Sequence, residues 1–165
     1  MKIILVMSVV LLIIISNFIS SIAVTSAEDN SCNDAYRLLS EDKVDEAISI
    51  LDEKLSIDGK DVVAISMLGE AYRKKRNHNK ALKLLNMAIS ADPKYPISYL
   101  YKGKLYFSMQ IFEEVQEEFN LFLENAKPLA ESAENRAFYV KCLHDIGTIY
   151  FELKRYDDFR AILDR

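Results

Sequence analysis

The sequence predicts an all-α protein, a solenoid of about four antiparallel helix pairs. Residues 62–95 read as two amphipathic helices joined by a short polar break. Small residues recur in step with this unit: Ala35, Gly69 and Gly103 are each 34 residues apart, and Gly147 follows 44 residues later. The composition also suits helices, with only 4 glycines, 3 prolines and no tryptophan. One helix pair cannot bury its apolar stripe alone, so repeated pairs imply a stack with a continuous core.

The recurring small residues point to a packing requirement. A small side chain at the crossing of two helices lets their backbones approach closely. Glycine inside a helix costs about 1 kcal/mol relative to alanine, so three glycines at matched positions indicate a role. Twelve residues after the four small residues lie Ala47, Ala81, Val115 and Phe159. The larger side chains of Val115 and Phe122 predict that the helices of the third pair lie further apart.

Residues 62–95 resemble the tetratricopeptide repeat. The residues that carry the resemblance are Leu68, Gly69, Tyr72, Ala81, Leu85, Ala88 and Pro93. The resemblance extends more weakly over residues 28–165, as repeats at about 28–61, 62–95, 96–129 and 130–165. It implies a right-handed superhelical solenoid in which the first helix of each pair lines a concave groove. In this family such a groove binds a peptide or a partner protein.

Residues 1–27 differ in composition from the rest of the chain. Lys2 is followed by an apolar, uncharged run that ends in small residues at Ala27. This pattern is typical of a secretory signal peptide cut after Ala27. The alternative is a retained membrane anchor, because residues 3–24 are long enough to span a bilayer. Either case predicts export of the repeats to a periplasmic or other extracytoplasmic compartment.

The helices of the first three repeats follow from periodicity and capping residues. Repeat one predicts helices from about Asn30 to Ser40 and over 44–57, with Asp58-Gly59 ending the second. Repeat two follows without a linker. Repeat three predicts helices over about 97–108 and 112–125.

Ten extra residues separate repeats three and four. Their composition (LAESAENRAF) favours helix, and Pro128 suits the first position of one. We therefore expect a single extended first helix from about 129 to 153. The alternative is a looped insertion, with non-helical backbone around residues 132–135.

The resemblance also places residues in the binding groove, near the first, fourth, eighth and eleventh positions of each first helix. These are Tyr36, Leu39, Val63, Ser66, Glu70, Arg73, Ile97, Leu100, Lys104, Phe107, His144, Thr148 and Phe151. The set is apolar and aromatic with a few charges, which suits an extended or helical peptide segment. It lacks the lysine and asparagine set with which some family members clamp a terminal carboxylate.

No residue pattern predicts catalysis, a cofactor or a metal site, so we expect a protein that is not an enzyme. Neither His78 nor His144 has a second ligand at metal-binding spacing, and no phosphate-binding glycine loop is present. The carboxylates over residues 113–118 read as a solvated helix face. Cys32 and Cys142 lie three repeats apart, too far for a disulfide, and Cys142 reads as a small core residue.

Charge excludes one class of partner. The chain carries 21 basic and 25 acidic residues, a net charge of −4, or −5 once Lys2 is removed with residues 1–27. A mildly acidic surface without a basic stripe argues against nucleic-acid binding. The sequence thus favours an exported scaffold for protein–protein interaction. Envelope assembly is one process in which such a scaffold acts. The alternatives are a membrane-anchored adaptor and a homodimer formed through the C-terminal repeat, whose second helix is short and ill-matched.

Overall fold

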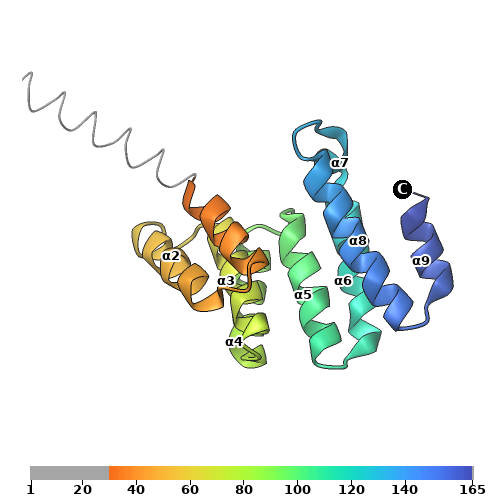
Figure 1. The fold of residues 1–165 in the computed structure, drawn as a ribbon, viewed down its shortest axis with the longest axis horizontal. Helices are drawn as coiled ribbons and strands as arrows, with labels where there is room; N and C mark the ends of the chain where they lie inside the picture. Colours follow the sequence, from red (N-terminus) through yellow and green to blue (C-terminus); the bar gives the residue numbers. More distant parts are fainter. Residues whose placement is uncertain (1–29, 165) are drawn as a thin grey trace, which may run out of the picture.

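The computed structural model describes residues 30–164, and the predicted signal peptide or anchor lies outside them. The described residues are helical, without a strand. A first helix covers residues 30–40. The others are α2 (Val44–Ile57), α3 (Val62–Lys74), α4 (His78–Ala91), α5 (Pro96–Ser108), α6 (Phe112–Asn125), α7 (Lys127–Glu131), α8 (Arg136–Glu152) and α9 (Tyr156–Leu163). Figure 1 shows them stacked in chain order.

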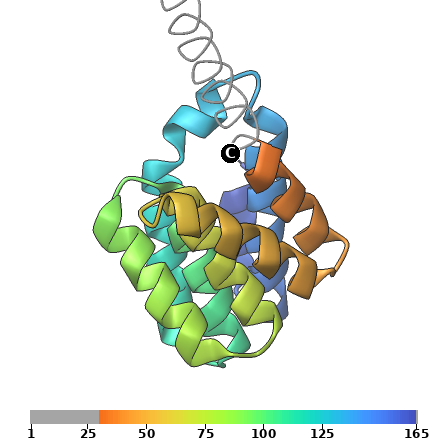
Figure 2. The ribbon, with the colours of Figure 1, turned by 90° about the vertical axis from the view of Figure 1, so that its left-hand side faces the viewer.

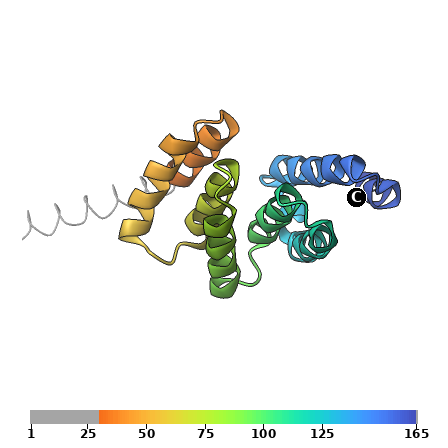
Figure 3. The same cartoon turned by 90° about the horizontal axis from the view of Figure 1, so that it is seen from below.

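The helices form consecutive pairs, as the sequence predicts. Helix 30–40 pairs with α2, α3 with α4, α5 with α6, and α8 with α9. Each pair also packs on the next, because α3 contacts α5 and α5 contacts α8. Seen from below, the pairs turn progressively about the long axis of the stack (Figure 3). The architecture is therefore a helical solenoid.

Two glycines lie where the helices of a pair approach most closely. A Cβ atom added to Gly69 would lie 2.7 Å from Leu85 Cγ, and one added to Gly103 would lie 2.4 Å from Phe119 Cε1. Both distances are too short for real atoms, so only glycine fits. At Gly103 the ring of Phe119 fills the space beside the glycine, and the expected wider spacing of the third pair stays a prediction. Val115 and Phe122 are both fully buried.

The turn inside each pair has the same backbone conformation. Asp42, Arg76, Gln110 and Lys154 all have φ between 57° and 61°. These residues follow the same 34- and 44-residue spacing as the small residues. In repeat two the backbone N–H of Asn77 donates to the Tyr72 carbonyl at 2.9 Å, which closes the end of α3. The four helix pairs therefore share the backbone geometry of the turn as well as the spacing of their small side chains.

The expected single helix over 129–153 is wrong, and the looped alternative is correct. α7 ends at Glu131, residues 132–135 are not helical, and α8 begins at Arg136. Ser132 is extended (ψ 122°), and its hydroxyl accepts a hydrogen bond from the Asn135 backbone N–H at 3.4 Å. Such local bonds compete with helix. α8 nevertheless has 17 residues where α3 and α5 have 13.

We expect Gly103→Ala to destabilise the protein by about 1–3 kcal/mol, because the added methyl group overpacks the contact with Phe119. Gly147→Ala is the matched control. Its Cβ would lie 3.4 Å from Phe159, an ordinary contact, so helix propensity should stabilise the variant by up to about 1 kcal/mol. Urea unfolding measures both changes. Equal effects of the two substitutions would contradict the close crossing.

Candidate functional site

The first helix of every pair contributes to one hollow on the concave side of the stack. Its volume is about 230 Å³. The lining residues are Tyr36, Leu39, Ser40, Glu70, Lys74, Leu100, Tyr101, Lys104, Phe138, Lys141, Cys142 and Asp145. They come from helix 30–40, α3, α5 and α8. We call this site the concave hollow.

One end of the concave hollow is closed by a contact between the first and last repeats. The ring of Tyr36 meets that of Phe138 edge to face, with centroids 5.7 Å apart. Lys141 Nζ donates to the Tyr36 hydroxyl at 2.7 Å and lies 4.9 Å from the ring centroid. Viewed along the stack, helix 30–40 and α8 lie on the same side (Figure 2). The concave side is therefore a closed hollow at this point and not an open groove.

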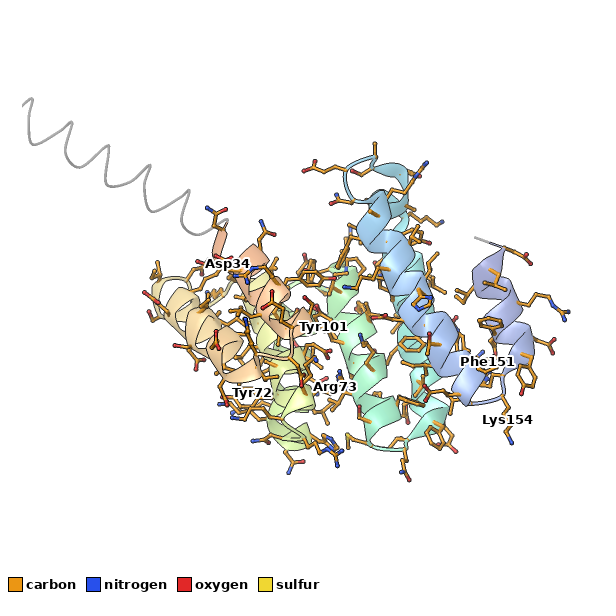
Figure 4. All side chains as sticks on the ribbon, in the orientation of Figure 1. Asp34, Tyr72, Arg73, Tyr101, Phe151 and Lys154 are labelled. Carbon is orange, nitrogen blue, oxygen red and sulfur yellow. The ribbon has the colours of Figure 1, made fainter. Side chains whose placement is uncertain are left out.

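Buried ion pairs form one wall of the concave hollow. Glu70 is only 5% exposed and accepts two hydrogen bonds from Arg73, at 2.6 and 2.7 Å. Arg73 also donates to Ser108 of α5, and Figure 4 shows it between α3 and α5. Burial acts to lower the pKa of Arg73, but bonding to Glu70 outweighs it and raises that pKa. Lys104 pairs with Asp145 at 2.7 Å, so these charges hold α3, α5 and α8 together.

Several predicted groove residues are buried between helices. Leu39, Ile97 and Leu100 are at most 4% exposed, and Ser66 is fully buried against Ser98, with their hydroxyls 2.7 Å apart. Ser66 and Ile97 do not line the concave hollow, whereas Leu39 and Leu100 present only a small part of their surface to it. For α3 the reason is geometric, because its fourth and eleventh positions face α5: Ser66 bonds to Ser98 and Arg73 donates to Ser108.

The other predicted residues divide between the concave hollow and other surfaces. Tyr36, Glu70 and Lys104 line the hollow, together with parts of Leu39 and Leu100. Val63 is exposed at the start of α3, outside it. Phe107 is half-buried, with its ring 6.1 Å from that of Phe112.

His144, Thr148 and Phe151 lie on a different surface, between α8 and α9. This end face encloses a hollow of about 540 Å³ lined by Val140, Leu143, His144, Gly147, Thr148, Phe151, Phe159, Ile162 and Leu163. Phe151 is 57% exposed and Leu163 68%; Figure 4 marks Phe151 at the lower end of α8. No other described helix covers this face.

Sequence reasoning missed Lys74, Phe138, Lys141 and Asp145 in the concave hollow and Val140 and Leu163 on the end face. Phe138 and Lys141 reach Tyr36 from the first turns of α8, which begins one turn earlier than α3 or α5 do relative to their glycines. The ten-residue insertion before α8 was the sequence feature that could have indicated these residues. Residue spacing alone, however, does not tell toward which repeat the extended start of α8 points.

A sequence model of the family described as "Tetratricopeptide repeat" matches residues 38–119, about half of the chain. The chain belongs to the tetratricopeptide repeat family. No curated protein matches the chain. Proteins with tetratricopeptide repeats generally mediate protein–protein interaction and are typically not catalytic.

The described repeats carry few of the groups that are typical of metal sites or nucleophilic catalysis. Across residues 30–164, no group of three or more potential ligands is placed to hold a metal ion. In the same range, no helix is long and apolar enough to cross a membrane. Cys142 is 3% exposed and belongs to the core, as the sequence predicts, and burial raises the pKa of its thiol to about 12. A protonated, buried thiol is a poor nucleophile.

Glu118 corrects the expectation that the carboxylates of α6 form a solvated face. It is 6% exposed and pairs with Lys102 at 2.8 Å, while its second oxygen has no partner. Burial raises the pKa of Glu118. The residue does not line the concave hollow or the end face, so this pair links α5 to α6.

We expect the free energy of unfolding to fall as the pH rises above about 9. The Cys142 thiol and the Tyr150 hydroxyl ordinarily ionise near pKa 9.0 and 10.0, but burial raises both pKa values to about 12 in the folded tetratricopeptide repeats. Their stabilising effect is complete below the unfolded pKa values and is lost as the pH rises through the folded ones. Urea midpoints at pH about 8 and about 10.5 measure the change, and equal midpoints would contradict it.

Proposed function

We propose that this tetratricopeptide repeat protein is a scaffold that binds a partner protein on its concave side. The observation that carries the proposal is that all four repeats contribute side chains to the concave hollow. A site of this kind exists only when the whole stack is formed. Charged groups around the hollow that are already paired and ordered lower the conformational cost of binding.

The size and charge of the concave hollow favour one kind of contact. About 230 Å³ is smaller than the 300–1,000 Å³ of common ligand pockets, so the hollow suits one or two anchoring side chains. Leu39 and Leu100 give it an apolar floor, and three lysines against two carboxylates make its wall slightly basic. An apolar anchor beside an acidic residue of the partner fits these features. This replaces the continuous peptide groove expected from the sequence.

We also propose that residues 1–27 export the repeats, so that the scaffold acts in a periplasmic or other extracytoplasmic compartment, for example in envelope assembly. The support is the sequence pattern of Lys2, the apolar run and Ala27. Sequencing the N-terminus of the protein from its own cells tests this. A chain that begins at Glu28 supports cleavage, a retained Lys2 in the membrane fraction supports an anchored adaptor, and an uncleaved cytosolic chain would contradict both.

A photo-crosslinking residue at Ser40 of the full chain should give a discrete adduct with a partner in the cells that make the protein. Ser40 lines the concave hollow and is exposed. The double variant Lys74→Glu with Lys141→Glu should reduce that adduct about tenfold or more, because it reverses the charge of the wall. A tenfold loss of affinity corresponds to about 1.4 kcal/mol of binding free energy. Because Lys74 also pairs with Asp42 and Lys141 with Tyr36, circular dichroism and urea unfolding check that the double variant keeps its fold.

Lys83→Glu is the matched control. Together with Lys94→Glu it makes the same charge change at two exposed positions outside the concave hollow, and the control should leave the Ser40 adduct intact. An adduct that is indifferent to Lys74 and Lys141 would place partner binding elsewhere, and the absence of any adduct would contradict concave binding.

A second candidate function is self-association through the C-terminal repeat. The observation that favours it is the end face, where Val140, Phe151 and Leu163 are each more than half exposed. Exposed apolar patches of this kind commonly mark protein–protein interfaces.

A further inference from the structure

The end face uses the same helix positions that, in the earlier repeats, contact the first helix of the next repeat. Along α8, Val140, His144, Thr148 and Phe151 form one stripe at spacings of four, four and three residues. In α3 the positions 78 residues earlier are Val62, Ser66, Glu70 and Arg73. There the next first helix, α5, covers the stripe: Ser66 bonds to Ser98 and Arg73 to Ser108. In α5, the corresponding Leu100 is 2% exposed and Lys104 pairs with Asp145 of α8.

The stripe on α8 has apolar and small side chains that suit a packed interface, but no other described helix covers it. Val140 is 56% exposed and Phe151 57%. The hydroxyl of Thr148 donates to the His144 carbonyl within the helix at 2.9 Å, so it does not need water as an acceptor. Thr148 is also small enough for another helix to approach closely. The position therefore suits a packed helix.

The opposite end of the stack cannot supply that helix. The outer side of helix 30–40 carries Asp34, Arg37 and Glu41, which are exposed and paired with one another at 3.2 and 3.3 Å; Figure 4 labels Asp34 there. Head-to-tail stacking of two copies would bury these charges against Val140 and Phe151, which is costly without new partners. An end face can instead meet a second end face, because an apolar stripe is complementary to itself about a two-fold axis.

We propose that the end faces of two copies pack together about a two-fold axis, with α8 of each copy in the place that the next repeat's first helix would take on the other. This inference deepens the second proposed function and rests on it. α8 is about 25 Å long and the α8–α9 pair about 20 Å wide. Each copy thus buries about 500 Å², or about 1,000 Å² in total, the lower limit for a specific interface. An interface of this size is typical of a reversible dimer.

Cross-linking of the full chain tests the proposal. The protein is purified from the cell fraction, soluble or membrane, in which its own cells accumulate it. Thr148→Cys places a thiol in the middle of the stripe, and a short bismaleimide should then join two copies in high yield. The controls are Glu117→Cys, an exposed position on α6, and the unmodified chain with Cys32 and Cys142. Both should give no cross-linked dimer.

Val140→Glu in the Thr148→Cys chain should weaken the dimer at least about tenfold, because it buries an unpaired charge. Ile57→Glu, which makes the same change at a residue 63% exposed at the end of α2, should have no effect. Val140 is largely exposed, so Val140→Glu should retain its helix content.

Three other results would overturn the proposal. Equal cross-linking at residues 117 and 148 would show random collision, and loss of the dimer with Ile57→Glu would place the contact elsewhere. A monomer at tens of micromolar by sedimentation, with no cross-link at residue 148, would exclude self-association while leaving partner binding in the concave hollow untouched.

Discussion

The structure depends on the close crossing of the two helices in each pair. At Gly69 and Gly103 no side chain fits, because Leu85 and Phe119 already occupy the space that a Cβ atom would need. This contact sets the distance between the helices, and the shared left-handed turn residue sets their direction. Once both are fixed, the position of the next pair follows. The solenoid is therefore the consequence of one local geometry repeated along the chain.

The insertion before α8 changes what this repetition produces. The break at residues 132–135 starts a first helix that is four residues longer than its predecessors. Its added turn carries Phe138, and the following turn carries Lys141, within contact distance of Tyr36. A local departure from the 34-residue period thus closes the concave side between repeats one and four.

The sequence predicted the features that depend on neighbouring residues. The helix pairs, the glycine crossings and the buried Cys142 all follow from periodicity and size, which a single sequence records. The prediction was wrong for residues whose role depends on which way the side chain points in the folded protein. Ser66 has the spacing of a groove residue but is buried against Ser98 of the next first helix. Glu118 stands among charged residues in the sequence but is buried and paired with Lys102. The contact of Tyr36 with Phe138 joins residues 102 apart, and no spacing rule reports it.

A double-mutant cycle between Tyr36 and Phe138 tests the closure of the concave side most directly. The cycle compares the free energies of unfolding of the wild type, Tyr36→Ala, Phe138→Ala and the double variant. Edge-to-face aromatic pairs contribute about 0.5–1.5 kcal/mol, so we expect a coupling energy in that range. A coupling energy of zero within error would mean that repeats one and four do not touch, and the concave side would then be an open groove.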